Sequence, residues 1–180
     1  LLPDVSFMGF DATKKKVEAV RRIVQKMGLT NVDVFAGRAE ELGHREDLRE
    51  KFDAVLSRAV APLATLLEYM SPFARVGGAL VCWKSLDIKE ELLASLDARE
   101  RLRCRLMERI PYDLDLLSMG LPTVVRRSCG ECQPSLAEAR LRPATSCGGW
   151  GRRQLLFFEK TGALPEEFPR GVGIPKRKPL

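Results

Sequence analysis

Short apolar segments alternate with helical segments along the first half of the chain, and this alternation constrains the fold more than any other feature. We expect strands over residues 5–10, 32–35, 52–56 and 79–83. We expect helices over residues 14–27 and from Pro62 to Met70. Short strands that alternate with longer helices build βαβ units around a parallel sheet, so the sequence predicts an α/β protein.

The helix over residues 14–27 is predicted to be amphipathic. Its apolar side chains recur at helical spacing and therefore share one face, which we expect to pack on the sheet. Gly28 follows as the expected stop. The side chains of this face are Val17, Val20, Ile23, Val24 and Met27.

Polar residues stand directly after the predicted strands. Ligands of parallel α/β sheets bind beyond the carboxyl ends of the strands, where these residues are expected to meet at one rim. They are Asp11, the loop Arg38–Glu40, Ser57 with Arg58, and Lys84. This convergence is the main indication of a site that comes from the residues themselves.

The second half of the chain is less regular. We expect a polar helix over residues 88–96 and a strand over 154–158. Residues 117–151, rich in Arg, Cys, Ser, Pro and Gly, are expected to form an irregular insertion or loop. We therefore divide the chain into a domain over residues 1–160 and a basic, Pro-rich C-terminal arm over 161–180, extended and without a helix.

Charge and cysteine content narrow the function. The net charge is +6, and residues 91–180 hold 16 Lys and Arg against 11 Asp and Glu, an excess that suits a polyanion such as RNA. No apolar run approaches the ~20 residues that span a bilayer. Five cysteines without a secretory signal predict reduced thiols in the cytoplasm. Cys129 and Cys132 have the spacing of half a zinc site, but with Cys147 the ligands reach only three, so no metal is expected.

Five sequence motifs occur in an order that resembles one family. They are "DATKKKV", "GRAEEL", "FDAVLSRAVAPL", "ARVGGALVCWK" and "FPRGVGIPKRKPL". Together they resemble the RsmG (glucose-inhibited division protein B) family of 16S rRNA guanine-N7 methyltransferases, over residues 4–96 and 152–180. The resemblance implies a Rossmann-like sheet that binds S-adenosylmethionine.

The chain departs from the family's pattern in two places. The family's glycine-rich loop lies roughly 20 residues before the acid that binds ribose. Only ten residues precede Asp11, so we expect a sheet that lacks the first strand and its glycine-rich loop, in a fragment of a longer protein. That strand is central in this fold, and its absence exposes two unpaired edges. Residues 117–151 are longer than the family's β-hairpin and unlike it in composition.

The resemblance assigns cofactor contacts to three places. Asp11, with Ala12 and Thr13, would bind the ribose hydroxyls, although an acid there can also cap the following helix. Ala39 and Glu40 would hold the adenine; the alternative is a solvated acidic loop. Arg58 would bind the methionine carboxylate or a phosphate of the RNA.

The expected RNA contacts are basic residues in the second half of the sheet and in the arm. Lys84 stands where the family has a Lys-Gly pair, with Ser85 in place of the glycine. In the arm, a phosphate clamp is expected, although a solvated tail would have the same sequence. The clamp residues are Arg170, Lys176, Arg177 and Lys178.

The implied reaction is methyl transfer from S-adenosylmethionine to N7 of a guanine in 16S rRNA, by a cytoplasmic monomer. Guanine N7 carries a lone pair and no proton, so positioning suffices and no catalytic acid or base is assigned. Three alternatives remain open: a methyltransferase for a small molecule or protein, a non-catalytic remnant that binds rRNA, and, more weakly, a dinucleotide-binding dehydrogenase.

Overall fold

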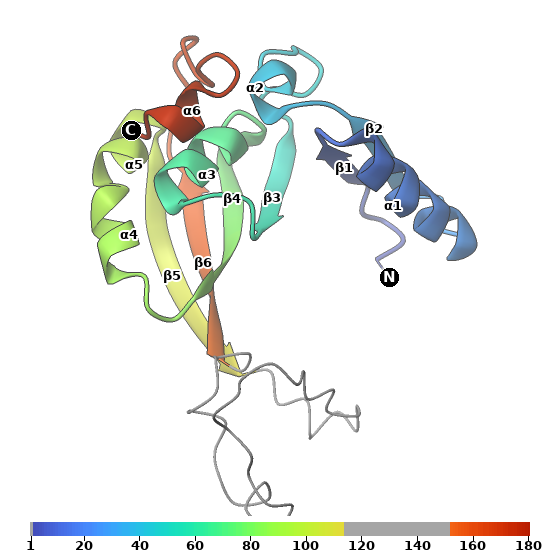
Figure 1. The fold of residues 1–180 in the computed structure, drawn as a ribbon, viewed down its shortest axis with the longest axis horizontal. Coiled ribbons are helices and arrows are strands. Elements are labelled where there is room, and N and C mark those ends of the chain that lie inside the picture. The colour runs from blue at the N-terminus through green and yellow to red at the C-terminus, as the bar shows by residue number, and fades with distance from the viewer. Residues whose placement is uncertain (1, 114–151) are drawn as a thin grey trace, which may run out of the picture.

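The structure is a computed structural model that describes residues 2–113 and 152–180 (Figure 1). Strands and helices alternate through its first half, as predicted for an α/β protein. Along the chain the elements are β1 (Phe7–Asp11), α1 (Lys14–Lys26), β2 (Val32–Ala36), α2 (Ala39–Leu42), β3 (Phe52–Arg58), α3 (Leu63–Met70), β4 (Ala74–Ser85), α4 (Lys89–Ala94), α5 (Leu96–Arg101), β5 (Cys104–Asp113), β6 (Arg152–Lys160) and α6 (Ile174–Arg177).

The strands form two separate sheets. In the smaller sheet β1 pairs with β2 in parallel; the larger has the order β3-β4-β6-β5, with β3 parallel to β4 and β6 antiparallel to both its neighbours. Figure 1 shows the β1–α1–β2 unit beside β3, joined to the rest of the chain through α2. Among the described residues β1 pairs only with β2 and β3 only with β4. The two unpaired edges expected from the sequence are therefore present.

The main core lies between one face of the larger sheet and the helices that cover it. Leu63 and Leu67 of α3 and Leu156 of β6 are fully buried, and Phe158 of β6 is only 1% exposed. Successive side chains of a strand point to opposite faces. Alternate residues of β6 are accordingly buried from Gln154 to Lys160, whereas those between them are only half-buried.

The apolar stripe of α1 is less buried than the sequence predicts. Val17 is buried, but Ile23 and Met27 are 55% and 59% exposed. The helix covers a sheet of only two strands, which is too narrow to bury the whole stripe.

The strand predicted over residues 79–83 is longer in the structure. β4 also includes Gly77 and Gly78, and its pairing with β3 shifts in register. Gly77 has a φ of +76°, and a Cβ on Gly78 would lie 2.9 Å from the Arg75 carbonyl oxygen.

The C-terminal segment, residues 161–180, is not an extended arm. It ends in the short helix α6 and packs on the domain. The Arg49 guanidinium donates hydrogen bonds to the carbonyl oxygens of Gly43, Leu164, Pro165 and Phe168, at 2.7–3.1 Å. The three contacts with Leu164, Pro165 and Phe168 join residues more than 100 positions apart, so local composition could not reveal them.

Two further expectations concern the insertion with its cysteines and a membrane-spanning helix. The irregular insertion over 117–151 and the cysteines Cys129, Cys132 and Cys147 lie outside the described residues. Among the described residues, no helix is long and apolar enough to cross a bilayer.

Candidate functional site

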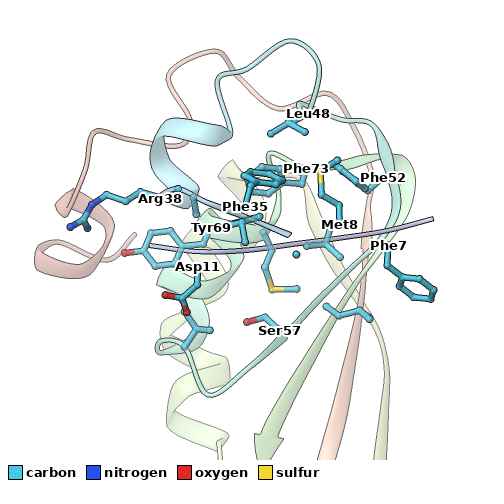
Figure 2. A pocket seen from close by; sticks show the side chains of 18 of the residues that line it. Phe7, Met8, Asp11, Phe35, Arg38, Leu48, Phe52, Ser57, Tyr69 and Phe73 are labelled. Carbon is cyan, nitrogen blue, oxygen red and sulfur yellow. The ribbon is translucent and has the colours of Figure 1, made fainter. Parts of the chain in front are cut away.

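A pocket of about 520 Å³ lies between β1 and β3, the strands at the unpaired edges of the two sheets. Its volume is within the range of roughly 300–1,000 Å³ typical of small-molecule sites. Figure 2 shows that the pocket has one polar end and one apolar end. Asp11, Arg38 and Tyr69 bring polar groups to one end, and Met8, Phe52 and Leu48 lie toward the other.

The pocket brings together the carboxyl ends of three strands. The end of β1 contributes Asp11 and Ala12, the segment after β2 contributes Arg38 and Ala39, and β3 contributes Ser57 and Arg58. Lys84, at the end of β4, is not part of the lining. Three of the four strand ends expected at one rim therefore meet in this structure.

Asp11 lies between the pocket and the start of α1. Its Oδ1 accepts a hydrogen bond of 2.7 Å from the Thr13 backbone N–H, and its Oδ2 lies 3.5 Å from Lys16 Nζ. The Thr13 hydrogen bond is the main cause that lowers the pKa of Asp11; burial opposes it, and Lys16 lowers the pKa further. The carboxylate is thus ionised at neutral pH. An ionised carboxylate has about four lone-pair sites, so Asp11 can cap α1 and still accept hydrogen bonds from a ligand.

Ala39 and Glu40 open the short helix α2, in place of the loop expected from the sequence. The Ala39 side chain lines the pocket and is only a methyl group. Glu40 is buried at 7% exposure, and its Oε1 accepts a hydrogen bond of 3.1 Å from the backbone N–H of Gly173. A solvated acidic loop does not describe this carboxylate, which instead binds the C-terminal segment.

Tyr69 is a residue of the pocket that the sequence did not point to. It lies near the end of α3, and its side chain lines the pocket. Burial raises the pKa of its phenol, and so do the nearby negative charges of Glu40 and Glu68. The helical spacing of α3 predicts a core helix and gives no sign that Tyr69 would meet a carboxylate from α2.

The expected arginine of the site, Arg58, is the last residue of β3 and is exposed. The next residue, Ala59, has a φ of +55°, so the chain turns sharply away from the strand at this point. Arg58 lines the same pocket as Asp11. The structure therefore places a solvent-accessible cation and an ionised carboxylate at one site.

The five cations expected to bind RNA fall into two groups. Lys84 is 12% exposed, and its ammonium binds the Glu91 carboxylate and, at 2.9 Å, the Ala61 carbonyl oxygen. Arg170 binds the buried carboxylate of Glu68. In contrast, Lys176, Arg177 and Lys178 are exposed, on α6 and just after it.

None of the side chains that line the pocket belongs to His or Cys. No group of three or more His, Cys, Asp or Glu within residues 2–113 and 152–180 is arranged to hold a metal ion. The one histidine, His44, is exposed, and its Nε2–H donates a hydrogen bond of 2.8 Å to the Pro169 carbonyl oxygen.

The sequence comparison decides the family. The family model described as "rRNA small subunit methyltransferase G" matches residues 1–106, more than half of the chain. This chain belongs to that family. A relative from Caldanaerobacter subterraneus subsp. tengcongensis, named "Ribosomal RNA small subunit methyltransferase G", is 41% identical over 184 residues, which cover 100% of this chain and 62% of the relative.

Other relatives and solved structures are also similar to this chain. A relative of the same name from Carboxydothermus hydrogenoformans is 31% identical over 100% of this chain and 63% of its own length. The chain thus spans less than two thirds of the length of these curated relatives. Among solved structures, a putative methyltransferase from Bacillus halodurans C-125 matches with a TM-score of 0.56 at 16% identity, over 89% of this chain and 85% of the other. That likeness shows the Rossmann-like methyltransferase fold that the sequence predicts.

Proposed function

We propose that this chain is the cofactor- and RNA-binding part of an enzyme that transfers a methyl group from S-adenosylmethionine to N7 of a guanine in 16S rRNA. Family membership supports methyl transfer to ribosomal RNA. The observation that carries the cofactor assignment is Asp11, an ionised carboxylate at the end of β1 that lines the pocket beside the ends of β2 and β3. We place the enzyme in the cytoplasm, as a monomer that acts on the small ribosomal subunit.

The residues present fit the adenosine part of S-adenosylmethionine. The free lone pairs of Asp11 suit the two ribose hydroxyls, and Ala12 and Thr13 follow at the same turn. Ala39 and the adjoining backbone of Glu40 offer a small surface for the adenine, since the Ala39 methyl group leaves room for a flat base. Arg58 supplies a cation for the methionine carboxylate.

When bound, S-adenosylmethionine supplies a methyl group on a positively charged sulfur. Guanine N7 would accept that methyl group through its own lone pair as the bond from sulfur to the methyl carbon broke, and the positive charge would pass from sulfur to the base. No proton is transferred, so the pocket needs no general base, which agrees with a lining free of His and Cys. The chain's own residues contribute by orienting the reactants and excluding water, an effect that can supply about 7–11 kcal/mol.

RNA would be held by the exposed cations of the C-terminal segment. Lys176, Arg177 and Lys178 carry their charges into solvent and can reach phosphate oxygens. Lys84 and Arg170 were expected to take part as well. Because their charges are engaged by Glu91 and Glu68, we propose for these two the role of holding the surface in shape.

A chimera tests the proposed function. The segment of the Caldanaerobacter relative that lies before its match to this chain is fused before Leu1, so that any strand it contains could pair between β1 and β3. We expect the chimera to bind S-adenosylmethionine well and residues 1–180 alone to bind it weakly, by calorimetry. It should then transfer a labelled methyl group to N7 of a guanine in unmodified small subunits, as read by mass spectrometry of the digested rRNA.

Three outcomes would contradict this assignment in different ways. Tight binding by the short chain would show that the cofactor site lies elsewhere. A chimera that binds the cofactor but methylates only a small molecule or protein would identify a different substrate. A chimera that binds rRNA but no cofactor would be a non-catalytic RNA-binding protein.

A further inference from the structure

Helix α1 carries a large part of the charge of the protein. It holds six cations and one carboxylate, a net charge of +5, whereas the whole chain has a net charge of +6. All seven side chains are exposed. An excess of this size on one helix is typical of a surface that binds a polyanion. The cations are Lys14, Lys15, Lys16, Arg21, Arg22 and Lys26, and the carboxylate is that of Glu18.

Three of these cations share one face of α1. Lys15, Arg22 and Lys26 are seven and four residues apart, and a helix of 3.6 residues per turn brings such positions into one row. Val17 and Val24 lie on the opposite side of the helix, where Val17 is buried and Val24 is half-buried. The three cations, which we call the cationic row of α1, therefore face away from the sheet and into solvent.

The charges of the cationic row are open to a ligand. Within residues 2–113 and 152–180, no carboxylate lies within 4.0 Å of the ammonium of Lys15 or Lys26. Arg22 lies 4.0 Å from Glu18, and the two side chains are 72% and 61% exposed. An exposed pair at this separation contributes little, so the guanidinium can exchange its partner for a phosphate.

The arrangement of the cations is unfavourable for the helix itself. Lys14, Lys15 and Lys16 fill the first turn, which has no acidic residue, although the N-terminus of a helix carries a partial positive charge. Arg22 and Lys26 are four residues apart and repel each other. A helix with a merely solvated polar face would be more stable with charges of alternating sign, so this pattern favours a binding role.

The start of α1 adjoins the proposed cofactor pocket. Lys16 Nζ lies 3.5 Å from Oδ2 of Asp11, which lines the pocket. From this end the cationic row extends along the helix for about 16 Å, at 1.5 Å per residue, long enough to contact more than one phosphate. Figure 1 shows α1 on one side of β3 and α6 on the other. Because the pocket lies between β1 and β3, a polyanion held at both helices would span it.

We propose that the cationic row of α1 binds phosphates of ribosomal RNA, as a second RNA-binding surface on the side of the pocket opposite α6. This inference rests on the proposed function, because membership of an rRNA methyltransferase family supplies the polyanion. Phosphate contacts fix the position of a nucleic acid without reading its sequence. Contacts on both sides of the pocket would thus hold the strand while the target guanine reaches the cofactor.

The test measures the affinity of residues 1–180 for protein-free small-subunit rRNA, by filter binding over a range of salt concentrations. The α1 variant combines Lys15→Gln, Arg22→Gln and Lys26→Gln, which remove the charges of the row and keep residues that favour a helix. The slope of log affinity against log salt should become shallower by about 2, at about 0.7 per lost contact, and affinity at about 0.1 M salt should fall roughly a hundredfold.

The matched control removes the same charges from another part of the surface. Lys51→Gln, Lys89→Gln and Arg101→Gln also replace two exposed lysines and one exposed arginine. Arg101 forms an ion pair with Asp97, four residues earlier, as the arginine of the cationic row does with its own carboxylate. Screening by salt confines charge effects to short range, so the control should stay within about twofold of wild type. Equal losses in the two variants would overturn the proposal, because net charge alone would then explain them.

The outcomes separate this inference from the proposed function. If the α1 variant keeps the wild-type salt slope while replacement of the α6 cations makes it shallower, RNA binding stands and the α1 surface is wrong. If the wild-type chain binds no rRNA, the proposed RNA contacts fail and this inference fails with them. Binding of wild type to phosphatidylcholine vesicles that contain phosphatidylserine, but not to rRNA, would overturn the proposal in favour of a membrane surface.

Urea unfolding checks that the α1 variant is folded. Its stability should be at least that of wild type, because the substitutions remove two cations that repel each other across one helical turn. A loss of RNA affinity without a loss of stability would then belong to the surface of α1.

Discussion

The buried carboxylate of Glu68 holds Arg170 by three hydrogen bonds. It accepts the backbone N–H at 2.9 Å, Nε at 2.8 Å and Nη2 at 2.6 Å. The Glu68 side chain is fully buried and that of Arg170 is 24% exposed. A buried carboxylate needs such partners, and the pair therefore fastens the C-terminal segment to α3.

Removal of the arginine side chain should destabilise the protein. Arg170→Ala leaves the Glu68 charge buried without its main partner, and we expect the free energy of unfolding to fall by about 3–5 kcal/mol, measured with urea. The exposed pair Arg45–Asp47 has a similar separation of 2.6 Å and supplies the control. Arg45→Ala should change stability little, and equal losses in the two variants would contradict the importance of burial.

Stability should fall in acid through Glu50. Burial acts to raise the pKa of Glu50, but the hydrogen bonds from the Leu164 N–H and Lys160 Nζ outweigh it, so the net pKa is lowered. A lowered folded-state pKa gives stability that is present above the unfolded value of about 4.3 and is lost as pH falls through the folded value. Glu50→Gln should therefore be less stable than wild type at pH 7, and the gap should close in acid.

The matched control for this experiment is Glu166→Gln, an exposed carboxylate of the same C-terminal segment. Its stability should follow wild type across the whole pH range, measured by urea unfolding at each pH. A gap for Glu50→Gln that stays constant down to pH 3 would show that the Glu50 contacts do not depend on its charge.

The buried cysteines should be unreactive in the folded protein. Burial raises the pKa of Cys82 and Cys104 to about 12, so almost no thiolate exists at neutral pH. Replacement of Cys129, Cys132 and Cys147 by Ser leaves these two as targets. Iodoacetamide should label neither until denaturant is added, as followed by mass spectrometry; rapid labelling of the folded protein would show that this core opens readily.

Replacement of Arg58 should affect the binding of S-adenosylmethionine, whereas replacement of the exposed cations on and just after α6 should affect the binding of RNA. In the chimera, Arg58→Ala should weaken S-adenosylmethionine binding roughly ten- to a hundredfold, the effect of one charged hydrogen bond. The triple replacement of Lys176, Arg177 and Lys178 by Ala should leave cofactor affinity unchanged and make the salt dependence of RNA binding shallower by about 0.7 per lost contact. Arg170 is kept, because it stabilises the fold.

Two results would revise this division. An unchanged salt slope in the triple variant would show that the α6 cations are merely solvated. If Arg58→Ala keeps cofactor affinity while RNA binding collapses, Arg58 belongs to the substrate side of the site.

Local sequence patterns predicted the elements that build the pocket. Apolar runs gave β1, β2 and β3 to within a few residues, and the acid after the first of them, Asp11, lies at the pocket. Patterns of this kind succeed because strand and helix periodicity depends on neighbours in sequence. β5 was not predicted from the sequence, because its charged residues, such as Arg105 and Glu108, interrupt the apolar pattern.

Contacts between distant residues could not be predicted in the same way. Arg170 has the sequence context of a basic tail, and its partner Glu68 lies 102 positions away on α3. Lys84 follows a strand as a ligand-binding cation would, yet Glu91 on α4 neutralises it. In both cases the cation's function depends on a carboxylate that tertiary packing supplies, and no local pattern records it.

The separation of the two sheets also affects how the chain unfolds. The β1–α1–β2 unit buries Val17 and leaves much of its apolar stripe in water, whereas the larger sheet shares one continuous core with α3 and α5. The smaller unit should therefore open at a lower free-energy cost, as a cooperative unit of its own. Its amide hydrogens would exchange before those of β4 and β6, and one melting temperature would not describe residues 1–180.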